Sequence, residues 1–150
     1  MKSIRKTILL LALLASTLTM TSNVFAQDWP MVGGDYWDVA AITIKDGGGL
    51  KYARWLADEW RENNEFAKSK GWIKGYFVLS NVHARKGEAD LYLIRVMENM
   101  ASGPEGDKRG KEFVEWKKKT ADEMQAESGN RAEYREVTSS SLLQVLNFRD

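Results

Sequence analysis

The only histidine in the chain, His83, lies between two apolar runs in the stretch YFVLSNVHARKGEADLYLIRV. An imidazole suits a general base, a haem ligand or a metal ligand, because it changes charge near neutral pH. Arg85 and Lys86 would repel a cation, and the only carboxylates nearby belong to Glu88 and Asp90. We therefore expect His83 to lie exposed at a loop tip, with a catalytic or ligand-holding role as the alternative.

Arg95 carries the second candidate chemistry, because it is a cation on an apolar strand face. Alternate residues of a strand share one face, and those that share it with Arg95 are apolar: Ala89, Leu91, Leu93 and Met97. A guanidinium in such surroundings needs a partner. We expect Asp38, near the start of the first predicted strand, to approach Arg95 across the central strand pair, close to Tyr36. The two side chains would form an ion pair that fixes the strand register, or Arg95 would anchor an anionic ligand in a cavity.

Trp60, Asn63 and Asn64 form a third cluster, on a helix predicted over residues 50–70. Trp60 falls on the apolar stripe of that helix and is expected to be a core side chain. Asn64 lies on the same stripe, where it would cap a buried backbone group or line a pocket. By residue type alone, the cluster resembles the polar and aromatic residues of cofactor-independent monooxygenases, and Tyr76 would join it in such a site.

Motifs of the common enzyme classes are absent from the sequence. It has no P-loop, no dinucleotide fingerprint, no serine nucleophile elbow and no His-Glu-x-x-His helix. Gly47, Gly48 and Gly49 precede a helix, but no lysine or threonine follows them as in a phosphate loop, so they predict a flexible turn. We expect neither a cofactor nor a metal ion.

The elements that must position these residues alternate along the chain. Aromatic and β-branched runs predict strands over residues 36–44, 72–80, 88–97 and 134–148, the last with an interruption at 139–141. Helical spacing predicts helices over residues 50–70 and 107–127, the second with Phe113, Trp116, Thr120 and Met124 on its buried side. The order predicts an α+β fold of the ferredoxin-like βαββαβ type, with a four-stranded antiparallel sheet and two helices on one face.

The second face of this sheet would be bare in a single chain. Both faces of the predicted strands are apolar. In the second strand, for example, Ile73, Phe77 and Leu79 on one face alternate with Trp72, Tyr76 and Val78 on the other. A face exposed to water would carry polar residues at every second position. The pattern therefore predicts a homodimer in which two sheets pack face to face.

The first 26 residues are typical of a cleaved signal peptide. Lys2, Arg5 and Lys6 precede an apolar run, and Ala26 ends a suitable cleavage site. Loss of this leader would change the formal net charge of +1 to −2, which does not indicate a nucleic-acid partner. No apolar segment is long enough to predict a membrane span, and an uncleaved N-terminal anchor is the alternative to a cleaved leader. The chain has no cysteine. We expect one domain over residues 27–150, located in the periplasm or secreted.

Three stretches resemble the dimeric α/β-barrel superfamily, specifically its small exported bacterial members of unassigned function. They are Tyr36-Trp37-Asp38-Val39, the helix with Trp55 and Trp60, and Gly71-Trp72-Ile73. The resemblance implies a dimer but not a reaction. Two hypotheses follow. The first is an exported barrel protein that binds a small apolar or anionic ligand. The alternative is a cofactor-independent monooxygenase-like enzyme acting on an aromatic or apolar substrate. In either case, the candidate ligand-binding residues are Arg95, Asp38, Trp60, Asn64 and Tyr76.

Overall fold

A computed structural model describes residues 29–150, so the predicted signal peptide and its cleavage site lie outside the described residues. The fold is α+β. In chain order the elements are β1 (Met31–Ile44), α2 (Gly49–Trp55), the π-helical turn η1 (Leu56–Trp60), α3 (Arg61–Ser69), β2 (Gly75–Ser80), β3 (Leu91–Met97), α4 (Gly103–Lys117), α5 (Ala121–Asn130), the short 3-10 helix η2 (Arg131–Glu133) and β4 (Arg135–Phe148). The α+β class and the four-stranded sheet are consistent with the predicted ferredoxin-like arrangement.

The chain divides into two compact units. Residues 33–147 form the larger unit, and the described part of the smaller unit comprises residues 29–32 and 148–150. Within the smaller unit, Arg149 donates from its backbone N–H to Pro30 O at 2.9 Å and from Nε to Trp29 O at 3.1 Å. The cavities described below belong to the larger unit.

The four strands form one open antiparallel sheet in the order β2-β3-β1-β4. Asp38 of β1 lies directly opposite Arg95 of β3, as the sequence predicts. The strand extents were predicted wrongly at several points. β1 begins at Met31 rather than at residue 36, β2 begins at Gly75 rather than at residue 72, and β3 begins at Leu91 rather than at residue 88. β4 continues through residues 139–141 without interruption. Hydrogen bonding to the long neighbouring β1 outweighs the weak strand preference of three serines.

The first helical segment is continuous from Gly49 to Ser69, with a π turn in its middle. Its buried residues are spaced four apart: Tyr52, Leu56, Trp60 and Asn64. In a regular α-helix, each four-residue step would rotate this stripe by about 40°. The wider π turn counters that rotation and keeps the stripe on the sheet. Tyr52, Leu56 and Trp60 form the core with Ile42 of β1 and Leu93 of β3.

The second predicted helix is in fact two helices. Lys118 adopts a left-handed conformation (φ 53°) and ends α4, and Thr120 then caps α5 in a capping box with Glu123. Thr120 is therefore exposed at a helix terminus and does not lie on a buried face as predicted. The pair packs on α3 through Trp116, whose ring stacks on Phe66 with centroids 4.2 Å apart.

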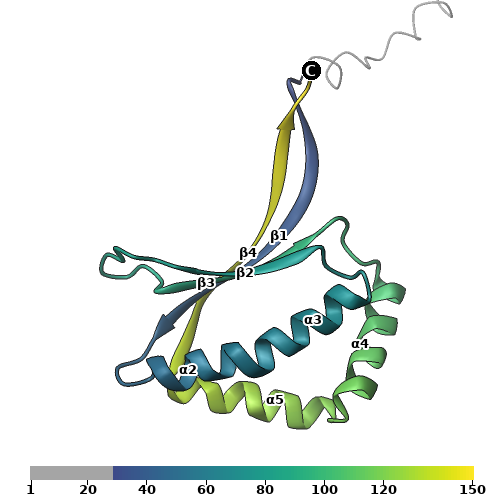
Figure 1. Cartoon of the computed structure of the whole chain (residues 1–150). Helices are drawn as coiled ribbons and strands as arrows, with labels where there is room; N and C mark the ends of the chain where they lie inside the picture. Colours follow the sequence, from purple (N-terminus) through teal and green to yellow (C-terminus); the bar gives the residue numbers. More distant parts are fainter. Residues whose placement is uncertain (1–28) are drawn as a thin grey trace, which may run out of the picture. The chain divides into compact units, whose positions relative to one another are not determined.

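All helices lie on one side of β2 and β3 (Figure 1). The opposite face of the sheet is apolar, because Trp37 and Phe77 lie there with ring centroids 6.4 Å apart. Phe77 and Leu79 remain 49% and 48% exposed. Within residues 29–150, no helix combines the length and the apolar character that a membrane crossing requires.

Candidate functional site

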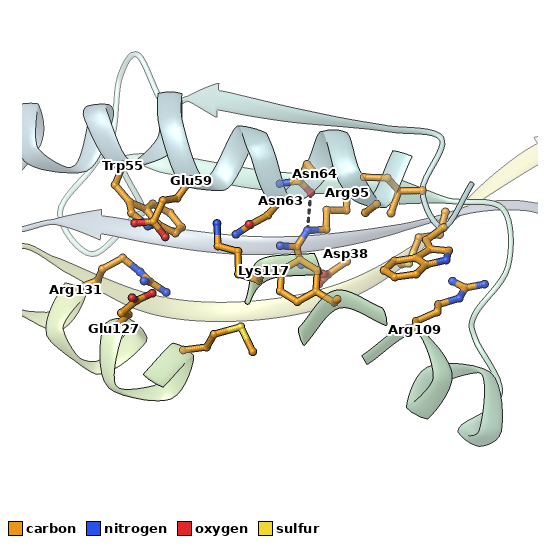
Figure 2. Close-up of a pocket in the computed structure, with 16 residues that line it drawn as sticks. Asp38, Trp55, Glu59, Asn63, Asn64, Arg95, Arg109, Lys117, Glu127 and Arg131 are labelled. Carbon is orange, nitrogen blue, oxygen red and sulfur yellow. Dashed lines mark hydrogen bonds and ion pairs between the residues drawn. The ribbon is translucent and has the colours of Figure 1, made fainter. Parts of the chain in front are cut away.

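A cavity of about 470 Å³ lies between the sheet, the α2–α3 segment and the α4–α5 pair (Figure 2). One part of its wall is apolar: Ala67, Trp72, Ile73, Met97, Phe113 and Met124. The other part carries amide and charged side chains: Asp38, Glu59, Asn63, Asn64, Arg95, Arg109, Lys117, Glu127 and Arg131. The wall therefore offers apolar surface together with many amide and charged groups, so it can hold a ligand that has both an apolar and a polar part.

Arg95 reaches the cavity from the middle of β3, and two partners orient it. Its Nε donates to Asn64 Oδ1 at 2.8 Å, and its NH1 nitrogen lies 3.7 Å from Asp38 Oδ2. The 3.7 Å distance to Asp38 is too long for a hydrogen bond. Asp38 therefore partly neutralises the charge of Arg95 but leaves its N–H groups free to donate to another acceptor. No hydrogen bond within residues 29–150 engages the terminal nitrogens of Arg95, whose side chain is 44% exposed. These nitrogens can therefore bind an anion in the cavity.

Asn64 holds Arg95 from a buried position. Only 1% of the Asn64 surface is exposed, and Asn64 Nδ2 donates to the carbonyl oxygen of Trp60, one helical turn earlier, at 2.6 Å. That bond fixes the amide, so its oxygen points to the guanidinium (Figure 2). Both predicted roles of Asn64 are therefore present, because it satisfies a buried backbone carbonyl and lines the cavity.

Most of the other charges on the wall are paired. Arg109 binds Glu105 at 2.8 Å, Lys117 binds Glu62 at 3.1 Å and Glu127 binds Lys119 at 2.6 Å. The hydrogen bond from Arg109 lowers the pKa of Glu105, and the bond to Glu127 raises the pKa of Lys119. Arg95 differs from these paired residues, because its terminal nitrogens make no hydrogen bond within residues 29–150 and are accessible to a ligand in the centre of the cavity.

One end of the cavity is built from aromatic rings and guanidinium groups. The Trp55 ring stacks on Tyr52, with centroids 5.5 Å apart, and the Arg131 guanidinium lies 4.3 Å from the Trp55 ring centre. Burial raises the pKa of Tyr52 to about 12, and it lowers the pKa of Arg131, which also lies near Arg135. A smaller cavity of about 170 Å³ adjoins this end and shares Asp38, Trp55 and Arg95 with the larger one.

The structure brings together Arg95, Asp38 and Asn64 of the five predicted site residues. Trp60 is buried and lines only the smaller cavity. Tyr76 lines neither cavity, because its hydroxyl donates to Glu65 on the exposed surface, and this bond raises the pKa of Tyr76. His83 lies exposed between β2 and β3, as predicted. In the described part of the chain, no three acidic or histidine side chains gather to hold a metal ion.

Several wall residues were not predicted from the sequence. Trp55 and Glu59 precede Asn63, a member of the predicted cluster, at four-residue spacing, so helix periodicity could have placed them in one row with it. Arg109 and Arg131 were also not predicted, and the place of Arg131 depends on the break between α4 and α5.

Comparisons with protein-family models, with curated proteins and with solved structures give no match. The resemblance to dimeric α/β barrels therefore stays a prediction.

Proposed function

We propose that this protein binds a small organic anion with an apolar body in the large cavity. Arg95 carries this proposal, because its Nε is fixed by Asn64 while its terminal nitrogens face the cavity. The apolar residues of the wall would cover the body of the ligand, and Asp38 would orient the guanidinium. Anion binding here combines a charge-assisted hydrogen bond with burial of apolar surface.

A matched pair of probes tests this proposal: a phenylalkanoate and its neutral primary amide. Binding can be followed by tryptophan fluorescence, because Trp55 and Trp72 line the cavity. A hydrogen bond to a charged group should favour the carboxylate by about tenfold, at the low end of the usual range because Arg95 is partly exposed.

The substitution Arg95→Gln should remove this preference, so that the two probes bind equally. Arg85→Gln is the matched control, since Arg85 is exposed in the β2–β3 connection and lines neither cavity. If Arg95→Gln kept a tenfold preference for the carboxylate, Arg95 would not be the anchor.

The alternative of a cofactor-independent monooxygenase receives less support from the geometry. The site expected for it combined Trp60, Asn64, Tyr76 and Arg95 around one substrate. Arg95 lines both cavities, but Asn64 lines only the large one, Trp60 lines only the smaller one, and Tyr76 lines neither. If the protein consumed oxygen in the presence of a phenylalkanoate, that result would support the monooxygenase alternative.

We also propose an exported homodimer of the α/β-barrel type, with the outer sheet faces in contact. The half-exposed Phe77 and Leu79 support it, because such residues on one face mark interaction surfaces. Light scattering of residues 27–150 should then give twice the chain mass, and Phe77→Glu should give the single chain mass. A wild-type monomer would refute the dimer without affecting the anion site.

A further inference from the structure

The smaller cavity, of about 170 Å³, combines an apolar wall with two arginines. Its aliphatic wall residues are Ala40, Ile42, Leu93 and Val137. Its charged wall residues are Asp38, Arg95 and Arg135, so Asp38 is the only acid among the described residues that line it. Asp38 lies 3.7 Å from Arg95. The carboxylate of Asp38 therefore balances Arg95, and no acid of this wall is left to balance Arg135.

Arg135, at the start of β4, is partly buried and has no protein counter-ion within the described residues. It forms no ion pair with any side chain of residues 29–150. Burial raises the pKa of Tyr52, and the charge of Arg135 opposes this rise. Burial lowers the pKa of Arg131, and the charge of Arg135 lowers it further. Because Tyr52 also lines the smaller cavity, the charge of Arg135 lies close to that cavity and can attract an anion into it.

Both arginines line the same cavity although their backbones lie far apart on the sheet. Arg95 lies opposite Asp38 of β1. Tyr134, which precedes Arg135, accepts a hydrogen bond from Lys45 N at 3.1 Å, just past the end of β1. The path along β1 from Asp38 to Lys45 is about 20 Å at the usual rise of a strand. The two side chains therefore reach the cavity from different ends, and two separate anionic groups fit this arrangement better than one carboxylate shared by both.

We propose that the ligand of the anion site is a dicarboxylate, with one carboxylate on Arg95 and the second, at the end of an alkyl chain, on Arg135. The chain would lie in the smaller cavity, where the aliphatic residues cover it, while the apolar body stays in the large cavity. The volume of about 170 Å³ is room for about six groups of the size of a water molecule, which suits such a chain. The inference rests on the proposed anion site and specifies the other end of its ligand.

Two probes of equal length isolate the second carboxylate: 2-benzylsuberate, a phenylalkanoate with a second carboxylate at the end of its chain, and the monoamide at that end. Tryptophan fluorescence follows their binding, because Trp55 lines both cavities. Wild type should bind the dicarboxylate about tenfold more tightly, and Arg135→Gln should remove this preference. Arg54→Gln is the matched control for the loss of one positive charge, since Arg54 is exposed on α2 and lines neither cavity.

A second variant tests the place of the chain without changing any charge. Val137 lines only the smaller cavity, so Val137→Phe should fill part of it. We expect this variant to weaken binding of both chain probes about fivefold and to bind the simple phenylalkanoate within about twofold of wild type. Val145→Phe is the matched control, because Val145 is exposed on the same strand and lines neither cavity.

The outcomes separate this inference from the anion site. A tenfold preference that survived in Arg135→Gln, equal binding of the two chain probes to wild type, or unchanged binding of both to Val137→Phe would refute the dicarboxylate. The anion site would still stand if Arg95→Gln abolished the preference for the simple phenylalkanoate over its amide. If wild type showed no such preference, the anion site and the inference would both be refuted. Urea midpoints close to that of wild type would show that the variants are folded.

Discussion

The hydrogen bond between Arg95 and Asn64 can be measured by a double-mutant cycle. Asn64→Ala removes two hydrogen bonds, one to Trp60 O and one from Arg95 Nε. The first, between neutral groups, contributes about 1 kcal/mol, and the second contributes about 1–2 kcal/mol after allowance for the 44% exposure of Arg95. We therefore expect Asn64→Ala to reduce the free energy of unfolding by about 2–3 kcal/mol.

Arg95→Ala should cost about 1–2 kcal/mol, because it leaves the buried Asn64 oxygen without its partner. In the absence of Asn64, the same substitution should cost little, since water reaches the exposed part of Arg95. The coupling between the two positions should then be about 1–2 kcal/mol.

Urea unfolding, monitored by tryptophan fluorescence at one fixed protein concentration, measures all four members of the cycle. The slope of free energy against urea should be the same for each, so that the midpoints report stability alone. A coupling below about 0.3 kcal/mol would lie within the scatter of independent sites. It would mean that Asn64 does not hold Arg95, and the orientation assigned to the anion anchor would be refuted.

Two further predictions concern the core and the helix start. Gly48→Ala should destabilise the protein by about 2 kcal/mol or more, because the added Cβ would lie 2.3 Å from Tyr134 O. Gly49→Ala is the control: its Cβ would have no atom within 4 Å, so it should be neutral or slightly stabilising in the same urea experiment. Because burial raises the Tyr52 pKa from 10.0 to about 12, its contribution to stability is complete below pH 10 and is lost as the pH rises toward 12. Across this range wild type should lose up to about 2 kcal/mol more stability than Tyr52→Phe, because the raised pKa values of Tyr76 and Lys119 affect both proteins alike. Equal losses in the two proteins would assign the effect to other groups.

Some of the site was predictable because it depends on strand pairing. Once β1 and β3 are antiparallel neighbours, the position of Asp38 opposite Arg95 follows from topology. A cation among apolar neighbours signals the need for a partner, and this reasoning identified Arg95 without any structural information. Asn64 was recognisable in the same way, as a polar residue on the buried stripe of its helix.

Tyr76 shows where such reasoning fails. Strand alternation places it on the helix side of the sheet, opposite Arg95 in the register of β2 and β3. Its ring packs edge-on against Trp60, with centroids 5.2 Å apart, but its hydroxyl continues outward to Glu65. Alternation fixes the side of the sheet on which a residue lies, and the length and direction of the side chain decide whether its polar end reaches the cavity.

The far wall of the cavity depends on the break between α4 and α5. Lys118 takes a left-handed conformation that is uncommon for a residue other than glycine, and helix periodicity does not reveal such a stop. Thr120 and Glu123, however, form a capping box that is visible in the sequence and marks a new helix start. A straight helix over residues 107–127 would have continued in the direction of α4. The break gives α5 its own direction, and Glu127 and Arg131 thereby line the end of the cavity where Trp55 lies (Figure 2). That end of the cavity is therefore a consequence of one local backbone feature, while the Arg95 anchor is a consequence of the sheet.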